Sequence, residues 1–159
     1  MLRCSLMDFT DEQINCIVEK IIGCGIEVHR EFGPGLLESV YRECFGIELK
    51  NAELDFEVER QFPLKYKGMP IKSRFQVDFV VEDAVIVELK SIEAVHPIHL
   101  AQVVTYLRLT DCPAGLIMNF NVMSLRTGLR RLWHPSRYLG KRRPAECHRS
   151  LGDSSDQLS

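Results

Sequence analysis

Two carboxylates and one ammonium interrupt the valine-rich segment DFVVEDAVIVELK, residues 78–90. A strand that only fills a core has no use for Asp78, Glu88 and Lys90 among its valines. Along 85–90 successive side chains point to opposite faces of a sheet, so Glu88 and Lys90 share a face, about two strand rises apart. The segment therefore belongs either to a sheet with one solvated face or to a site whose charges are placed for chemistry.

Asp78 joins this face under only one register of the predicted hairpin. If Val81 pairs with Val85 across a three-residue turn at 82–84, Asp78 stands opposite Glu88. A two-residue turn without a bulge would place Asp78 on the other face, and no acidic pair would form. An acidic site at Asp78 and Glu88 therefore requires the three-residue turn.

Two carboxylates that converge near a strand end offer hard oxygen ligands suited to Mg²⁺ or Mn²⁺. Such an ion takes one or two protein carboxylates, and waters and substrate phosphate complete its coordination. It polarises a phosphoryl oxygen and lowers the pKa of a bound water. A lysine two residues further on can orient that water and offset charge developing on the phosphate. The alternative is an ordinary cross-strand pair of acid and lysine on a solvated face.

Two further stretches carry polar side chains at a spacing that favours a site. In QVVTYL, Gln102 and Tyr106 lie four residues apart and share a helix face, with His99 about one turn before them. In GPGLLESVY, Glu38 stands in the first turn of a predicted helix, where the helix dipole favours a carboxylate, and Tyr41 follows. The alternatives are a polar helix face for the first stretch and an N-terminal charge with an aromatic core contact for the second.

The surrounding sequence predicts the elements that would position these residues. Apolar residues at helical spacing predict a helix over 11–31, with Thr10 and Gln13 as a capping box. Glycine and proline at 33–35 end it, and a second helix is expected over 36–51. The expected apolar side of that second helix consists of Leu36, Leu37, Val40, Cys44 and Ile47.

After the second helix the hydrophobic period changes from helical to alternating. Strands are expected over 56–66, 71–81, 85–90, 115–120 and 128–133, with a helix over 97–110. The first strand is expected to kink at Pro63, and Pro97 suits the first position of the helix. The order ααβββαββ predicts an α/β domain with a central mixed β-sheet flanked by helices.

Length and composition limit the class of protein. A chain of 159 residues with 45% hydrophobic and 26% charged residues is typical of one globular domain. No segment approaches the ~20 apolar residues that span a membrane, and the start lacks the apolar run of a signal peptide. We therefore expect a cytoplasmic protein without membrane contact.

The six cysteines form no C-x-x-C pair, so we expect reduced thiols and no zinc site.

Charge is distributed unevenly along the chain. Residues 122–159 carry eight Lys/Arg and three Asp/Glu, a net +5, whereas residues 1–121 carry −7. We expect residues 1–134 to form the domain and residues 135–159 to form a basic, disordered tail without apolar periodicity. Such a tail either contacts a polyanion or is simply solvated.

Five segments, in this order along the chain, carry a family resemblance: VHREFGPGLLESVY, ERQFPLKYKG, FQVDFVVEDAVIVELKSIE, HLAQVVTYL and GLIMNF. Together they resemble the GxxExxY proteins, a group within the PD-(D/E)XK nuclease superfamily. The resemblance covers roughly residues 10–133, and only the combined pattern is specific. It implies a restriction-endonuclease-like core, that is, a central mixed sheet flanked by helices with a metal site at its edge.

The resemblance also implies a role for each charged residue of the first motif. Asp78 and Glu88 would bind the Mg²⁺ or Mn²⁺ ion, and Lys90 would be the catalytic lysine. Glu38 would supply an additional acid from the early helix.

Other positions match the family with less defined roles. Gln102 and Tyr106 resemble an element that supports the catalytic site or contacts nucleic acid. His29 and Gly35 match the approach to the second helix. The basic tail matches no part of the family pattern.

The combined features predict a metal-dependent nuclease that hydrolyses phosphodiester bonds in nucleic acid, with DNA favoured over RNA. Nucleic acid is then the expected partner, and a homodimer is a further option. The alternative is a catalytically silent nucleic-acid-binding or protein-interaction module on the same fold. The acidic body favours this alternative, and the intact set of Asp78, Glu88 and Lys90 argues against it.

Overall fold

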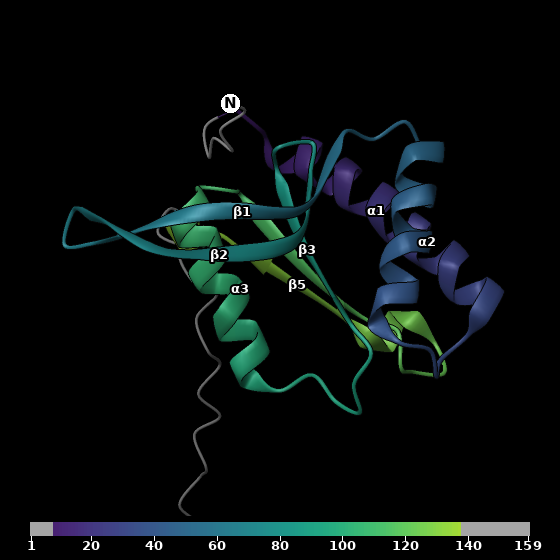
Figure 1. Cartoon of the computed structure of the whole chain (residues 1–159). Helices are drawn as coiled ribbons and strands as arrows, with labels where there is room; N and C mark the ends of the chain where they lie inside the picture. The colour runs from purple at the N-terminus through teal and green to yellow at the C-terminus, as the bar shows by residue number, and fades with distance from the viewer. Residues whose placement is uncertain (1–7, 138–159) are drawn as a thin grey trace, which may run out of the picture.

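The computed structural model describes residues 8–137 and has the predicted order of helices and strands (Figure 1). The helices are α1 (Asp11–Phe32), α2 (Glu38–Asn51) and α3 (Pro97–Thr110). The strands are β1 (Phe56–Tyr66), β2 (Met69–Val81), β3 (Val85–Lys90), β4 (Ala114–Asn119) and β5 (Leu129–Trp133). Two short 3₁₀ turns, η1 (Leu125–Gly128) and η2 (Pro135–Arg137), flank β5.

The five strands form one mixed sheet in the order β1-β2-β3-β4-β5. Only β3 and β4 run parallel, and α3 provides the crossover that this pairing requires. Helices α1 and α2 pack on one face of the sheet, and α3 packs on the other (Figure 1). The predicted α/β class with a helix-flanked mixed sheet is confirmed.

Local signals in the sequence define the ends of α1. The Thr10 side chain accepts from the Gln13 amide, and the Gln13 side chain accepts from the Thr10 amide, so the predicted capping box is present. The helix ends at Gly33, whose φ of 65° lies in the left-handed region that favours glycine.

The predicted apolar side of α2 is only partly correct, because Leu36 and Cys44 pack against the core and the other three residues do not. The five residues proposed for this side were Leu36, Leu37, Val40, Cys44 and Ile47. Of these, Leu37, Val40 and Ile47 are exposed. The buried side consists of Tyr41, Phe45 and Leu49. Tyr41 stacks on Phe120 with ring centroids 4.5 Å apart, and Phe45 meets Phe79 edge-on at 5.0 Å. Both sides have helical spacing, and the aromatic side buries more apolar area against the sheet.

The hairpin between β2 and β3 adopts the register on which the acidic pair depends. Val81 pairs with Val85 across a three-residue turn, and Phe79 pairs with Val87. Val85, Val87 and Leu89 belong to the core beneath α1 and α2, and Ile86 belongs to the core beneath α3. The alternation predicted for this strand is therefore observed.

The described residues include the first three of the expected tail. Residues 135–137, the first of the expected tail, form η2, and Arg137 pairs with Asp11 of α1 at 2.6 Å. The rest of the expected tail, residues 138–159, lies outside the described part of the chain. No helix within residues 8–137 is long and apolar enough to cross a membrane.

The cysteines only partly match the expectation of reduced thiols. Cys16, Cys24 and Cys44 are free. Cys112, fully buried behind α3, is disulfide-bonded, so the expectation is wrong for this residue.

Candidate active site

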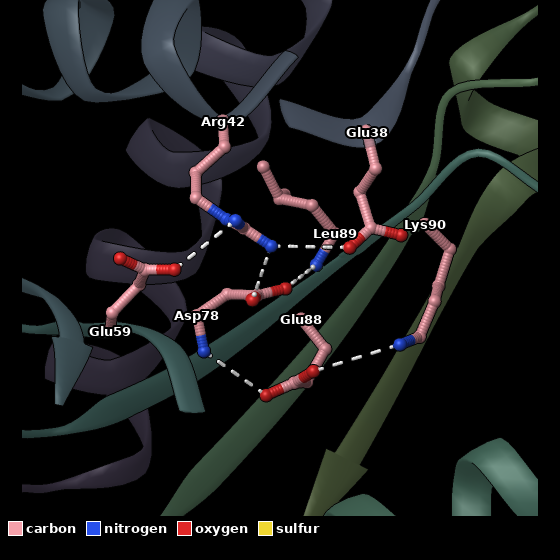
Figure 2. A network of polar contacts seen from close by, with 7 residues as sticks. All are labelled: Glu38, Arg42, Glu59, Asp78, Glu88, Leu89 and Lys90. Atoms are coloured by element: carbon pink, nitrogen blue, oxygen red, sulfur yellow. Dashed lines mark hydrogen bonds and ion pairs between the residues drawn. The ribbon is translucent and has the colours of Figure 1, made fainter. Parts of the chain in front are cut away.

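Asp78 and Glu88 lie together where strands β2 and β3 separate. The regular ladder ends at the Phe79–Val87 pair, one position before the two acids. Their carboxylates then bind the backbone groups that the ladder leaves unpaired. The Asp78 amide donates to Glu88 Oε1 at 3.2 Å, and the Leu89 amide donates to Asp78 Oδ2 at 2.9 Å (Figure 2). The two carboxylates thus replace backbone hydrogen bonds at the end of the β2–β3 ladder.

Both acids are buried, and their proximity changes the protonation of one of them. Asp78 is 8% exposed and Glu88 is 6% exposed. Burial, and then the negative charge of Asp78, raise the pKa of Glu88 from 4.5 to about 7, against the opposing effect of Lys90. Without a bound cation the site therefore holds more negative charge than its surroundings readily accommodate.

Lys90 lies on the same face as Glu88, as the alternation predicts. Its Nζ atom is 3.9 Å from Glu88 Oε2, which is a long ion pair (Figure 2). The Lys90 side chain is 20% exposed, so its ammonium stands between the buried acids and solvent. A phosphate that approached the acidic pair from solvent would meet this ammonium.

Arg42 of α2 joins the acids in a network that the sequence analysis did not anticipate. One guanidinium nitrogen, Nη2, contacts Asp78 Oδ1 at 3.0 Å and Glu38 Oε1 at 3.2 Å, and Nη1 contacts Glu59 Oε1 at 3.3 Å (Figure 2). Arg42 therefore supplies the positive charge that faces Asp78. Its spacing of four residues from Glu38 was the available signal, because residues four apart share a helix face.

The turn before α2 sets the position of Glu38, and Tyr41 holds that turn. The Tyr41 hydroxyl donates to the Gly33 carbonyl at 2.6 Å and accepts from the Leu36 amide at 3.1 Å. The Ser91 hydroxyl donates to the Leu36 carbonyl at 2.6 Å, which ties the same turn to the end of β3. Glu38 consequently starts its helix next to the strand that carries Glu88.

Gln102 and Tyr106 form a polar pair on α3, on the other side of the sheet from α2. Gln102 Nε2 donates to the Tyr106 hydroxyl at 2.9 Å, so the predicted shared face is observed. Burial, and then the charge of Glu88, raise the pKa of Tyr106, which places its hydroxyl within the field of the acidic pair. The Tyr106 ring stacks on Phe75 of β2 at 4.9 Å.

His29 and Gly35 stabilise the fold through a hydrogen bond and a turn conformation, respectively. His29 Nε2 lies 2.8 Å from the Val122 carbonyl and its ring lies 6.3 Å from Phe120, so it joins α1 to the segment after β4. Gly35 has a φ of 104°, which other residues rarely adopt, and this allows the tight turn into α2.

The donor set of the acidic pair fits a hard divalent cation. Mg²⁺ commonly binds one or two carboxylates and completes its octahedron with waters and phosphate oxygens. Asp78 and Glu88 supply two adjacent carboxylates, and burial, followed by the charge of Asp78, raises the pKa of Glu88, so a bound cation would stabilise its charged form. Within residues 8–137, no group of three or more His, Cys, Asp and Glu side chains forms a complete cluster for a metal. Substrate or water oxygens would therefore have to complete the coordination.

A comparison with protein families agrees with this architecture. The sequence model of the PD-(D/E)XK nuclease superfamily matches residues 15–132, about three quarters of the chain. A search of curated proteins found no match. A solved structure described as "Crystal structure of SSO0001" aligns with 61% of this chain and 50% of its own, at 17% identity and a TM-score of 0.46. Because the family match runs from within α1 to β5 and covers most of the chain, the chain belongs to the PD-(D/E)XK nuclease superfamily, with its restriction-endonuclease-like fold.

Proposed function

We propose that this protein is a metal-dependent nuclease that hydrolyses phosphodiester bonds in DNA. The observation that carries the proposal is the buried pair of Asp78 and Glu88 at the end of the β2–β3 ladder, with the Lys90 ammonium 3.9 Å from Glu88. Membership of a nuclease superfamily supports nucleic acid as the substrate. The preference for DNA and the cleavage itself are parts of the proposal.

In this proposal the acidic pair holds Mg²⁺ or Mn²⁺. The bound ion would polarise the scissile phosphate and acidify a water. Asp78 is oriented by the Leu89 amide, and Glu88 by the Asp78 amide, so both carboxylates are fixed before substrate arrives. Hydrolysis adds the oxygen of water to phosphorus, breaks one P–O ester bond and leaves a hydroxyl and a phosphate monoester.

The remaining residues act on the charge and position of the phosphate. Lys90 donates hydrogen bonds from the solvent side of the pair and offsets the charge that develops on the phosphoryl oxygens. Glu38 is an additional acid held near the pair through Arg42. Gln102 and Tyr106 support the site from α3 or contact the nucleic acid beside it.

Finer features of the proposal follow from the sequence. Gly35, Glu38 and Tyr41 spell the pattern G-x-x-E-x-x-Y, which supports assignment to the GxxExxY group within the superfamily. The cytoplasmic location and the homodimer stay predictions.

The proposal is tested by incubating the purified protein with single- and double-stranded DNA and RNA in Mg²⁺, Mn²⁺ or EDTA. We expect cleavage of DNA that requires the ion and that is lost in Asp78→Asn, which removes one ligand charge with little change of shape. Cleavage that persists in EDTA, or equally in Asp78→Asn, would contradict the assigned site.

A catalytically silent binding module is the second candidate, and Arg42 is the observation that favours it. Its guanidinium already satisfies Asp78 Oδ1 and so competes with a metal ion for that carboxylate. If the parent protein binds nucleic acid but cuts none of the substrates in either ion, this second candidate is correct.

A further inference from the structure

The distal part of the β1–β2 hairpin projects from the sheet as an arm, here defined as residues 62–75. Figure 1 shows its closed end standing clear of α3 and of the other strands. The turn is a tight one at Lys67 and Gly68, with positive φ values of 48° and 82°. The arm contains four Lys/Arg and no Asp or Glu, although residues 1–121 as a whole carry a net charge of −7.

Three of the arm's cations share one face. Pro63 pairs with Arg74 and Lys65 pairs with Pro70, and the register shifts by two residues between these pairs. Because a shift of two residues keeps the same side chains on the same face, Lys65, Lys72 and Arg74 lie on one side of the ribbon. All three side chains are exposed. Within residues 8–137 none of the three forms an ion pair with a carboxylate. The face is therefore a stripe of positive charge available to a polyanion.

The base of the arm is fixed beside the candidate active site. Phe62 and Phe75 stack across the two strands with centroids 5.2 Å apart, and Phe75 stacks in turn on Tyr106 of α3 at 4.9 Å. Phe75 and Asp78 lie three residues apart on β2, so the same strand leads from the arm into the acidic pair. The arm and Asp78 therefore adjoin each other along β2.

The other face of the arm is apolar, and this raises a second option. Tyr66 and Met69, which pair with each other, and Ile71 are exposed there. Such a face alone would suit a protein partner. The cations without carboxylate partners, on an otherwise acidic body and next to a phosphate-cleaving site, favour a polyphosphate partner instead.

We propose that the basic face of the arm binds the phosphate backbone of duplex DNA beside the cleavage site, with the ribbon lying in the major groove. This inference rests on the nuclease function proposed above and specifies its substrate as a DNA duplex. The major groove of B-DNA, about 12 Å wide, admits a two-stranded ribbon, whereas the deep, narrow major groove of duplex RNA does not. From Phe62 to Tyr66 the arm covers four residue steps, about 13 Å, which is long enough to cross such a groove.

The test measures binding to a labelled DNA duplex of about 20 base pairs, two helical turns, over a range of salt concentrations. Ca²⁺ replaces Mg²⁺ so that cleavage does not consume the probe. The arm variant carries Lys65→Gln, Lys72→Gln and Arg74→Gln. Its control carries Lys20→Gln, Lys50→Gln and Arg108→Gln, which removes the same charge from exposed helix positions.

We expect the arm variant to bind the duplex at least about tenfold more weakly at low salt. Its slope of log affinity against log salt should fall by about 2.7, since each lost phosphate contact lowers the slope by about 0.9. The control variant should keep most of the parent's affinity and slope. Single-stranded DNA and duplex RNA of the same sequence should bind more weakly than duplex DNA and depend less on the arm.

Three results would overturn the inference: no measurable duplex binding by the parent, equal loss in both variants, or equal dependence on the arm for duplex RNA. A protein partner on the apolar face would leave DNA affinity and slope unchanged in the arm variant, and this too would overturn it. Cleavage in Mg²⁺ is measured separately on the same variants. Binding through the arm without cleavage contradicts only the nuclease proposal, and cleavage that is independent of the arm contradicts only the arm.

Discussion

Glu88 retains its proton to an unusually high pH because the fold buries it against a second acid. Burial is the larger cause, and the neighbouring Asp78 adds to it. On an isolated carboxyl of a solvated strand, neither burial nor a neighbouring acid would raise the pKa. The raised pKa therefore distinguishes the observed site from the alternative considered from the sequence, an ordinary acid–lysine pair on an exposed sheet face.

The first prediction concerns the stability of the metal-free protein against pH. The pKa of Glu88 is about 7 in the folded state and near 4.5 when unfolded. The stabilisation from its bound proton is complete below the unfolded value and is lost as pH rises through the folded value. As pH rises from about 4.5 to 7, loss of this proton should lower the free energy of unfolding by up to about 3 kcal/mol.

Urea unfolding in EDTA, at several pH values, measures this effect in the parent and in Glu88→Gln. The variant carries no titrating proton at this position, so its stability should fall less across the same pH range. Parallel pH profiles for the two proteins would show that Glu88 does not titrate abnormally.

The second prediction concerns Arg42, whose guanidinium and a divalent ion compete for Asp78. Arg42→Gln should lower the free energy of unfolding in EDTA by about 2 kcal/mol, because it leaves a buried carboxylate without its charged partner. Mg²⁺ should then raise the melting temperature more in this variant than in the parent, since the ion no longer displaces a guanidinium.

Arg30→Gln is the matched control for this comparison. It removes an ion pair with Glu27 in which both side chains are at least half exposed. Such a pair contributes little to stability, so both the EDTA stability and the Mg²⁺ response should match the parent. Equal Mg²⁺-induced shifts in Arg42→Gln and in the parent would contradict competition at Asp78.

The turn between α1 and α2 is the element that places Glu38, and Tyr41 is its main support. The third prediction is that Tyr41→Phe lowers the free energy of unfolding by about 1–3 kcal/mol, because the Gly33 carbonyl and Leu36 amide lose their partner while the ring keeps its packing. Denaturant unfolding measures this loss. Tyr66→Phe, at a hydroxyl on a ring that is mostly exposed, should change stability by less than about 0.5 kcal/mol. Equal stability of Tyr41→Phe and parent would contradict this role.

The sequence predicted every α-helix and strand that the structure describes, because each has either a clear hydrophobic period or an apolar run bounded by a cap or a turn, and it did not predict the two 3₁₀ turns. It failed for the buried face of α2, where two apolar stripes of similar spacing compete. Only the packing of Tyr41 and Phe45 on the aromatic residues of the sheet decides between them. Local sequence patterns cannot predict that tertiary contact.

The candidate site was predictable in part for the same reason. Strand alternation placed Glu88 and Lys90 together, and the three-residue turn placed Asp78 with them, because both depend on local geometry. The contact between Arg42 and Asp78 joins residues 36 positions apart, and no local pattern predicts it.

For the molecule as a whole, strand β2 connects the exposed basic arm to the buried acidic pair, because it carries both Asp78 and one side of the arm. Residues 1–121 carry a net negative charge that disfavours a polyanion, and the basic arm offsets it beside the acidic pair, so the arm and the site are expected to act on the same ligand. Chemistry at the pair and attachment through the arm are nevertheless separable. Experiments that measure binding and turnover independently can therefore assign each.

The most direct test of the nuclease proposal is single-turnover cleavage by Lys90→Met, measured alongside DNA binding in Ca²⁺. Methionine keeps much of the side-chain volume and removes the ammonium that faces the phosphate. We predict a loss of roughly a hundredfold in the cleavage rate, about 3 kcal/mol, with a much smaller change in affinity. Lys50→Met, at an exposed position near the end of α2, should cleave like the parent. Equal cleavage rates for the parent and Lys90→Met would contradict the assignment of the active site to Asp78, Glu88 and Lys90.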